Sequence, residues 1–351
     1  MRQFKLVVAM LMTSVLAGCG GSGSNQAPKI NFSSQVSFGD SLSDVGSYAV
    51  GTTIPAMGGG QYTINGTGKN WAALMAAQFG LPAPCAAQTG LSGFVASGFN
   101  APVTNHPGCT GYAQGGARVT NPVGTGNALL GGANAILGQL TVPVVTQIQN
   151  HLATVGGSFK GDEIVLVMAG ANDVLIQLGA VGQGLSSASA VAAVGTAATD
   201  LVTDINTQIT GKGAKYVVVV NVPDIAGTPK FSAAAQSAKD LINQMVTTFN
   251  SLLLAGVSSN ANVLYVDAYT VSHDQVTNPA PYGLTNVTLT ACNITDTTKN
   301  PLGSSLICNA NNLNAGVVDH YLFADDIHPT PYGYWLLARL VSKEMLTKGW
   351  L

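Results

Sequence analysis

Apolar runs of strand length are the feature that most restricts how this chain can fold. They read DEIVLVMAG from Asp162, AKYVVVVNVP from Ala214 and NVLYVDAY from Asn262, and a shorter run, QVSF, begins at Gln35. Continuous apolar strands are typical of sheets that are covered on both faces. Helical stretches lie between and after these runs, at residues 70–80, 143–155, 187–210, 231–256 and 331–349. This alternation predicts an α/β fold with a parallel central sheet and helices on both of its faces.

Two segments interrupt the alternation. Residues 81–115 are rich in Gly, Pro, Ser and Asn, which predicts a loop with room for one short strand. Residues 277–320 have no long periodic element, and a loop of this length is uncommon in a compact domain unless it has a function. We therefore expect residues 277–320 to pack beside the functional site as a lid or a pocket wall. We find no internal repeat and no second domain.

The amino terminus has the pattern of an export signal. Arg2 and Lys5 precede the apolar run Leu6–Leu16, which is shorter than the about 20 residues that span a bilayer. The run ends in LAGC, which resembles the bacterial lipobox, whose cysteine becomes the acylated first residue of the mature chain. Acyl chains contribute about 0.8 kcal/mol per buried CH₂, so a lipidated Cys19 would hold the protein at a membrane. Ordinary secretion with an incidental cysteine is the alternative.

These features divide the chain into three parts. We expect a lipoprotein signal peptide at residues 1–18, a lipid-anchored flexible tether at 19–33 and one folded domain at 34–351. Gly20 follows the cysteine, where an Asp would mark retention in the inner membrane of many Gram-negative bacteria. The expected location is therefore the cell envelope, at the outer membrane, and we expect a monomer that meets the membrane through Cys19.

The remaining cysteines indicate disulfides. Apart from Cys19 the chain has Cys85, Cys109, Cys292 and Cys308, an even number in a chain that is expected to reach an oxidising compartment. Sequence alone allows three pairings, and proximity favours Cys85 with Cys109 and Cys292 with Cys308. None of them has the spacing of a zinc or redox site.

Composition excludes several classes of function. Only 9% of the residues are charged and the net charge is −2, whereas binding to nucleic acid needs clustered Lys and Arg. The sequence contains no H-E-x-x-H and no G-x-x-x-x-G-K-[ST] motif. Metal-dependent hydrolysis and nucleotide binding therefore have no support, and the sequence implies no metal and no cofactor.

Polar residues follow the ends of the predicted strands. Ser41 comes after the first strand, Asn172 after IVLVMAG, and the motif ADDIHP, with Asp325 and His328, precedes the last helix. In open α/β sheets, ligands bind at the carboxyl ends of the strands. A serine nucleophile needs a base within hydrogen-bond reach and a group that orients the base. A tight turn would let the Asp325 carboxylate accept a hydrogen bond from one ring nitrogen of His328 while the other ring nitrogen faces Ser41. A plain turn at Ser41 and a capped helix start at ADDIHP are the alternatives.

Candidate donors for an oxyanion accompany these residues. The backbone N–H of Ser41, the backbone N–H of Gly116 in GYAQGGARV and the side-chain amide of Asn172 could point at a developing negative charge. The α/β-hydrolase elbow, G-x-S-x-G, does not fit, because Ser43 stands in place of its second glycine.

Four ordered blocks, FGDSLSD, YAQGGAR, GAND and DDIHP, resemble those of the SGNH or GDSL family of serine esterases and lipases. The resemblance extends from Val36 to the last helix and implies a three-layer α/β/α, flavodoxin-like fold. It implies Ser41 as the nucleophile and first oxyanion donor, Gly116 and Asn172 as the other donors, His328 as the general base and Asp325 as its partner. The implied substrate is a small-molecule or lipid ester.

Several functions remain open at this point. The implied activity is carboxylic ester hydrolysis through an acyl-enzyme. Acyl transfer to an alcohol and carbohydrate O-acetyl esterase activity would use the same residues, and a non-catalytic surface-binding module is the alternative of a different class. Acyl chain length and the natural alcohol are not encoded in any motif that we recognise.

Overall fold

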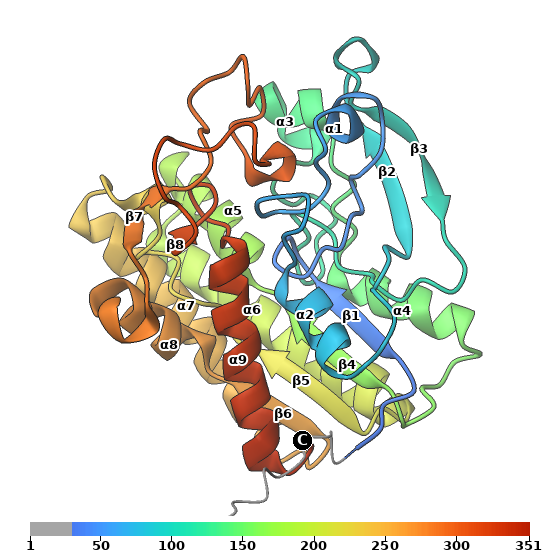
Figure 1. The fold of residues 1–351 in the computed structure, drawn as a ribbon. Coiled ribbons are helices and arrows are strands. Elements are labelled where there is room, and N and C mark those ends of the chain that lie inside the picture. Colours follow the sequence, from blue (N-terminus) through green and yellow to red (C-terminus); the bar gives the residue numbers. More distant parts are fainter. Residues whose placement is uncertain (1–29) are drawn as a thin grey trace, which may run out of the picture.

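The computed structural model describes residues 30–351, so the signal peptide, Cys19 and the tether as far as residue 29 lie outside the described residues. Four parallel strands form the central sheet in the order β1-β4-β5-β6 (Figure 1). They are β1 (Gln35–Gly39), β4 (Ile164–Met168), β5 (Tyr216–Val220) and β6 (Val263–Val266). Each coincides with one of the predicted apolar runs. The predicted parallel sheet is therefore confirmed.

An extended segment continues the sheet on the other side of β1. Ser37 donates its N–H to the carbonyl of Thr110, and Tyr112 and Gln114 donate theirs to the carbonyls of Ser37 and Gly39. The bridge between Ser37 and Gly111 is parallel. Counting this segment, the order along the sheet is that of flavodoxin-like folds, with the reversal beside β1. The crevice expected at such a reversal lies beyond the carboxyl ends of β1 and β4.

Helices cover both faces of the sheet, as predicted, because successive side chains of a strand point to opposite faces. Val165 and Val167 pack with α4 (Val144–Thr154), α6 (Ser187–Asp204) and α7 (Gln236–Val257) on one face. Ile164 and Leu166 pack with α2 (Trp71–Gln78) and α9 (Pro331–Lys348) on the other. Figure 1 shows α2 and α9 in front of the sheet and α4, α6 and α7 behind it.

The helix boundaries differ from the prediction in places. The expected helix 187–210 is α6 followed by a π-helical turn at Ile205–Ile209. The helix expected at 231–256 begins at Gln236, because Pro229–Phe231 forms a separate 3₁₀ turn. Four further helices had no counterpart in the prediction. They are α1 (Thr53–Ala56), α3 (Gly132–Leu137), α5 (Ala171–Gly182) and α8 (Ala268–Thr277).

The two segments that interrupt the alternation carry small sheets. Residues 81–115, expected as a loop with room for one short strand, contain the antiparallel strands β2 (Gln88–Ser92) and β3 (Asn100–Asn105). In residues 277–320, β7 (Asn286–Thr290) pairs in parallel with β8 (Tyr321–Phe323). Backbone pairing between segments that lack strong periodicity is the reason that the sequence did not reveal these strands.

Two disulfides hold these segments. Cys85 is bonded to Cys109 and Cys292 to Cys308, which confirms the pairing that proximity favoured. Cys292 and Cys308 are fully buried, together with Ala324 of the segment that follows β8. The second disulfide therefore ties residues 277–320 to the core next to the ADDIHP motif.

The packed domain begins ahead of residue 34. Phe32 is buried, and its ring lies 4.9 Å from that of Phe79 and 5.4 Å from that of Tyr216. Ile30 also packs against this cluster. The last residues of the predicted tether are thus part of the packing that covers the sheet.

Candidate active site

The turn after β1 presents Ser41 at the carboxyl end of the sheet. Gly39 ends the strand with φ +148°, and a Cβ there would lie 2.1 Å from the carbonyl oxygen of Met168, so only glycine fits this approach of β1 to β4. The N–H of Leu42 donates to Asp40 Oδ1 at 3.1 Å and the N–H of Ser43 to the Asp40 carbonyl at 3.1 Å. These bonds fix a tight turn in which Ser41 faces a cavity.

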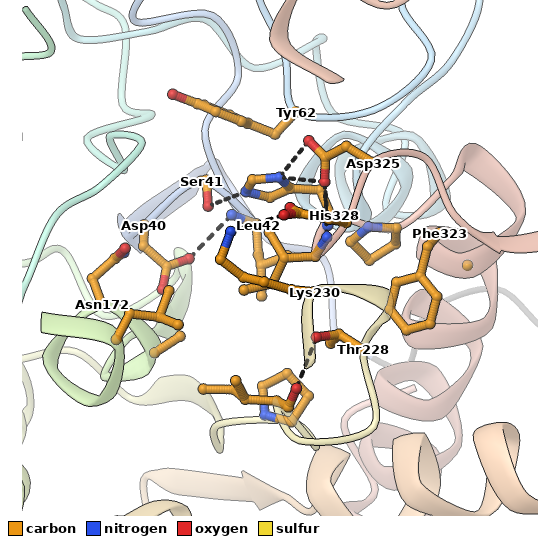
Figure 2. Close-up of a pocket in the computed structure, with 18 of the residues that line it drawn as sticks. Asp40, Ser41, Leu42, Tyr62, Asn172, Thr228, Lys230, Phe323, Asp325 and His328 are labelled. Atoms are coloured by element: carbon orange, nitrogen blue, oxygen red, sulfur yellow. Dashed lines mark hydrogen bonds and ion pairs between the residues drawn. The ribbon is translucent and has the colours of Figure 1, made fainter. Parts of the chain in front are cut away.

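Ser41, His328 and Asp325 form one hydrogen-bonded chain (Figure 2). His328 Nε2 lies 2.8 Å from Ser41 Oγ, and His328 Nδ1 lies 3.0 and 2.9 Å from Asp325 Oδ1 and Oδ2. The structure therefore brings together the three residues that the sequence predicted, although Ser41 and His328 are 287 positions apart. This is the geometry of a nucleophile, a base and a group that orients the base.

The turn from Asp325 to His328 is held by backbone donors. Asp325 Oδ1 accepts the N–H groups of Ile327 at 3.0 Å and His328 at 2.7 Å, and Asp325 Oδ2 accepts the N–H of Ser305 at 2.7 Å. Ser305 belongs to the segment 277–320, so this segment positions the carboxylate as well as walling the cavity. The Asp325 side chain is 2% exposed, and each of its two carboxylate oxygens accepts at least one backbone N–H.

Burial and charge shift the pKa values of Asp325 and His328 in opposite directions. Burial by itself would raise the pKa of Asp325, but the charge of His328 and the hydrogen bonds from His328 and Ser305 outweigh it and hold that pKa well below its usual range. Burial would lower the pKa of His328, and the negative charge of Asp325 outweighs it, so the pKa of His328 is raised. A charged Asp325 beside a basic imidazole is what proton abstraction from a serine requires.

The predicted oxyanion donors line the same cavity as Ser41. Within residues 30–351 the backbone N–H groups of Ser41 and Gly116 donate to no protein acceptor. The amide of Asn172 donates one hydrogen to the carbonyl of Ala117 at 3.0 Å, which holds the side chain and leaves its second hydrogen free. Gly116 has φ +78°, and a Cβ there would lie 1.8 Å from the carbonyl oxygen of Thr125. Glycine is therefore required for the close approach of this backbone.

The cavity in front of Ser41 has a volume of about 360 Å³. Its walls are mainly apolar, and their side chains come from α5, α8, α9, β8, the segment after β5 and the segment 277–320. They include Leu175, Ile225, Val271, Leu302, Phe323, Leu337 and Leu340. Leu302 and Ser304 confirm that residues 277–320 form part of the pocket wall. A cavity with apolar walls and a few convergent polar groups is typical of a small-molecule site.

Several residues around the triad were not singled out in the sequence. The ring of Tyr62 lies over His328, with centroids 4.7 Å apart (Figure 2). Asp44 accepts the N–H groups of Gly46, Ser47 and Gly115, so it ties the first block to the second. Asp44 lies within the FGDSLSD block and could have been identified from it, whereas no local signal marks Tyr62.

A buried carboxyl stands beside the nucleophile. Asp40 is 1% exposed, and burial raises its pKa to about 7, although the N–H of Leu42 and the charge of His328 oppose this. Burial likewise raises the pKa of Asp44 to about 6. Asp40 therefore changes its charge in the same pH range as an ordinary histidine.

The other histidines do not join the triad. The sequence analysis identified no carboxylate partner for His273, but its Nδ1 lies 2.8 Å from Oδ2 of Asp224, which follows β5. The two are 49 positions apart, and only the packing of α8 beside β5 brings them together. His151 is buried among Phe38, Tyr112 and Phe159 without a hydrogen-bond partner in the described chain, and burial lowers its pKa to about 4.

Comparison with known proteins places this site in a family. A profile of the GDSL-like lipase/acylhydrolase family matches residues 36–341, which contain the whole site. The chain belongs to this family. The match includes the four blocks from which the resemblance was drawn, and it accounts for the order in which they occur.

Individual relatives of this family are distant. The chain is 26% identical over 203 residues to the anther-specific proline-rich protein APG of Arabidopsis thaliana, a match over 52% of this chain and 35% of that protein. It is 25% identical over 146 residues to a GDSL esterase/lipase of the same plant, over 38% of this chain and 39% of that one. The matches therefore span about two fifths or less of either curated relative.

Solved structures with a similar arrangement have low identity. An extracellular lipase from Streptomyces rimosus is 14% identical, with a TM-score of 0.42 and coverage of 89% of this chain and 99% of that one. A catalytic mutant of an acetylxylan esterase from Geobacillus stearothermophilus is 13% identical, with a TM-score of 0.40 and coverage of 90% and 96%.

Two further observations concern metals and membranes. Among residues 30–351, no group of three or more His, Cys, Asp or Glu side chains is arranged to hold a metal ion. None of the helices in this range combines the length and the apolar character needed to cross a membrane.

Proposed function

We propose that this protein is a carboxylic ester hydrolase that works through a Ser41–His328–Asp325 triad and an acyl-enzyme. The observation that carries the proposal is the chain of hydrogen bonds, 2.8 Å from His328 Nε2 to Ser41 Oγ and 2.9 Å from His328 Nδ1 to Asp325. Membership of the GDSL-like lipase/acylhydrolase family supports it.

The steps follow from this geometry. Ser41 Oγ attacks the ester carbonyl carbon and gives its proton to His328 Nε2, while the Asp325 carboxylate stabilises the imidazolium. The N–H groups of Ser41 and Gly116 and the Asn172 amide then stabilise the oxyanion. His328 returns the proton to the leaving alkoxide, and an acyl group remains on Ser41. In the second half, water gives a proton to His328 and attacks the acyl carbon. The bond between this carbon and Ser41 Oγ then breaks, His328 returns the proton to Ser41 Oγ, and the acid is released.

The apolar cavity favours acyl groups longer than acetyl. Apart from the triad and the oxyanion donors, its walls are mainly hydrocarbon side chains such as Leu175, Val271 and Leu340. Each buried CH₂ of a substrate chain contributes about 0.8 kcal/mol, so a chain that fills more of the cavity binds more tightly. This supports a lipase or medium-chain esterase over a carbohydrate O-acetyl esterase.

The test uses the purified full chain with 4-nitrophenyl esters from acetate to palmitate and with an alkyl 4-nitrophenyl phosphonate. We expect an optimum at a chain longer than acetate, and one phosphonyl group on the peptide that contains Ser41, found by mass spectrometry. Labelling elsewhere, or a folded protein that cleaves none of the esters, would refute the proposal. An optimum at acetate would favour the O-acetyl esterase instead.

Attachment to the cell envelope through a lipidated Cys19 is also part of the proposal, and it is supported by the sequence LAGC. Radiolabelled palmitate is expected to enter the full chain in bacterial cells and not the Cys19→Ser variant. Equal labelling of both would contradict the anchor.

The pH dependence should report the charges around His328. Only neutral His328 accepts the serine proton, and Asp325 raises its pKa above the usual 6.5 with smaller contributions from Asp326 and Asp40. We therefore expect kcat/KM to rise with pH on a limb centred above 6.5. Asp326→Asn removes a negative charge that favours the protonated ring, so the limb should move to lower pH. Because Asp40 titrates near 7, the limb belongs to coupled groups.

The control for this prediction is Asp296→Asn. Asp326 lines the cavity and pairs with Lys230 at 2.8 Å. Asp296 pairs in the same way with Lys299, at 3.8 Å, but does not line the cavity. The pH profile of kcat/KM for the Asp296→Asn variant should coincide with that of the unmodified enzyme. A shift of the Asp326→Asn limb to higher pH, or no shift, would show that Asp326 does not act on His328.

A further inference from the structure

The cavity in front of Ser41 extends far beyond the triad. The same walls include Ser41 and His328, and also Val271 and Gln275 of α8 and Leu340 of α9. A second hollow, of about 590 Å³, shares Val271, Gln275 and Leu340 with the first. Val271 and Gln275 are four residues apart, so they lie on one face of α8. These three residues therefore form the boundary between the cavity of the nucleophile and the hollow beyond it.

Gln275 is the unusual member of this boundary. The Gln275 side chain is 7% exposed, and its amide makes no hydrogen bond in the described chain. The amide oxygen and nitrogen both keep some accessible surface. Since Gln275 lines both hollows, its accessible amide lies where the cavity of Ser41 meets the second hollow. The side chain thus combines burial with a free donor and a free acceptor.

Three other polar side chains of the cavity wall, those of Thr228, Ser272 and Asp224, already have hydrogen-bond partners. Thr228 Oγ1 donates to the carbonyl of Ile225 at 2.8 Å, as Figure 2 shows. Ser272 Oγ donates to the carbonyl of Tyr269 and accepts the N–H of Asp224. The Asp224 carboxylate accepts from Gly227 and pairs with His273. Each of these three side chains already has a partner, whereas the Gln275 amide has none within the described chain.

A substrate chain made only of hydrocarbon would be poorly accommodated beside Gln275. A buried amide that loses access to water without gaining a new partner makes substrate binding less favourable. A substrate oxygen at the same place would pair with the amide instead. Sites built to hydrogen-bond a substrate hydroxyl discriminate strongly against analogues that lack it.

We propose that Gln275 is a specificity-determining residue, which hydrogen-bonds an oxygen function, a hydroxyl or a carbonyl, on the hydrocarbon arm of the ester. The substrate class is thus an ester with an oxygenated chain. This inference rests on the proposed hydrolase function. The arm is the acyl chain or the alcohol chain, and the two are separated by the choice of substrates.

The experiment compares the full chain with Gln275→Met, which keeps the length of the side chain and removes the amide. One substrate set holds 4-nitrophenyl decanoate and its monohydroxydecanoate isomers. The other holds decyl acetate and the monoacetates of decanediols. We expect at least one hydroxylated ester in one set to exceed its parent about tenfold or more in kcat/KM. Gln275→Met should abolish this preference and raise kcat/KM for the parent.

Controls make the outcomes distinct. Asn243→Leu removes an amide oxygen that also lacks a partner, but it lies on α7 away from the cavity, so the preference should remain. Gln275→Leu replaces Gln275→Met if the latter has a lowered Tm. Ester cleavage without any preference for oxygenated chains, or a preference that survives both Gln275 variants, would overturn the inference and leave the hydrolase standing. A wild-type chain that cleaves no ester in either set would instead refute the hydrolase.

Discussion

Ser41→Ala is expected to lower kcat/KM for the best nitrophenyl ester by about 10⁴-fold or more, with Tm almost unchanged. Alanine removes the oxygen that attacks the carbonyl and the bond of 2.8 Å to His328, and it leaves the backbone N–H of residue 41 in place. Residual rate should come from the oxyanion donors and from substrate binding. Steady-state kinetics and thermal unfolding measure the two quantities.

Ser43→Ala is the matched control for this variant. Ser43 is two residues away, but its hydroxyl accepts the Trp71 indole N–H at 3.0 Å and does not line the cavity. Its loss leaves a buried N–H unpaired, which should lower the free energy of unfolding by about 1–3 kcal/mol while kcat/KM changes little. If Ser41→Ala retained activity within tenfold of the unmodified enzyme, Ser41 would not be the nucleophile.

Asp325→Asn is expected to lower kcat by about 10³–10⁴-fold with a smaller effect on KM. The Asp325 carboxylate accepts from three backbone N–H groups, those of Ser305, Ile327 and His328, and from His328 Nδ1. An amide has one accepting oxygen, so its NH₂ must face a donor. When it faces His328, the ring takes the tautomer that carries hydrogen on Nε2, and Nε2 can no longer accept the proton of Ser41.

Asp204→Asn makes the same chemical change on α6, at a carboxylate that does not line the cavity, and it should leave kcat unaltered. Comparison of kcat and KM for the two variants separates a loss of orientation from a general loss of structure. An Asp325→Asn enzyme whose kcat stays within tenfold of the unmodified value would show that Asp325 does not orient the base.

The residues of the proposed triad and the proposed oxyanion donors could be selected from the sequence because each lies in a short block with its own local geometry. Ser41 follows a buried strand, Asn172 follows another, and Asp325 and His328 share one turn in which the carboxylate accepts the N–H of His328. The sheet then brings the blocks together, because the carboxyl ends of parallel strands lie at one edge.

Contacts made across separate elements could not be predicted in this way. Ser305 donates to Asp325 from a segment without periodicity, Tyr62 lies over His328, and His273 reaches Asp224 from α8. The sequence allowed one short strand where β2 and β3 lie, and it predicted neither β7 nor β8, since the pairing of these strands depends on tertiary contacts.

The sequence by itself thus indicated the layers of the fold and the proposed reacting groups, and it favoured one pairing of the cysteines among three, since periodicity, turn chemistry and proximity are local properties. Only the tertiary structure decided the shape of the cavity and the isolation of Gln275 within it. Within the described chain the amide is buried without a hydrogen-bond partner, in a cavity that α8, α9 and the segment around Ile225 line together. No pattern within any one of these segments encodes that arrangement.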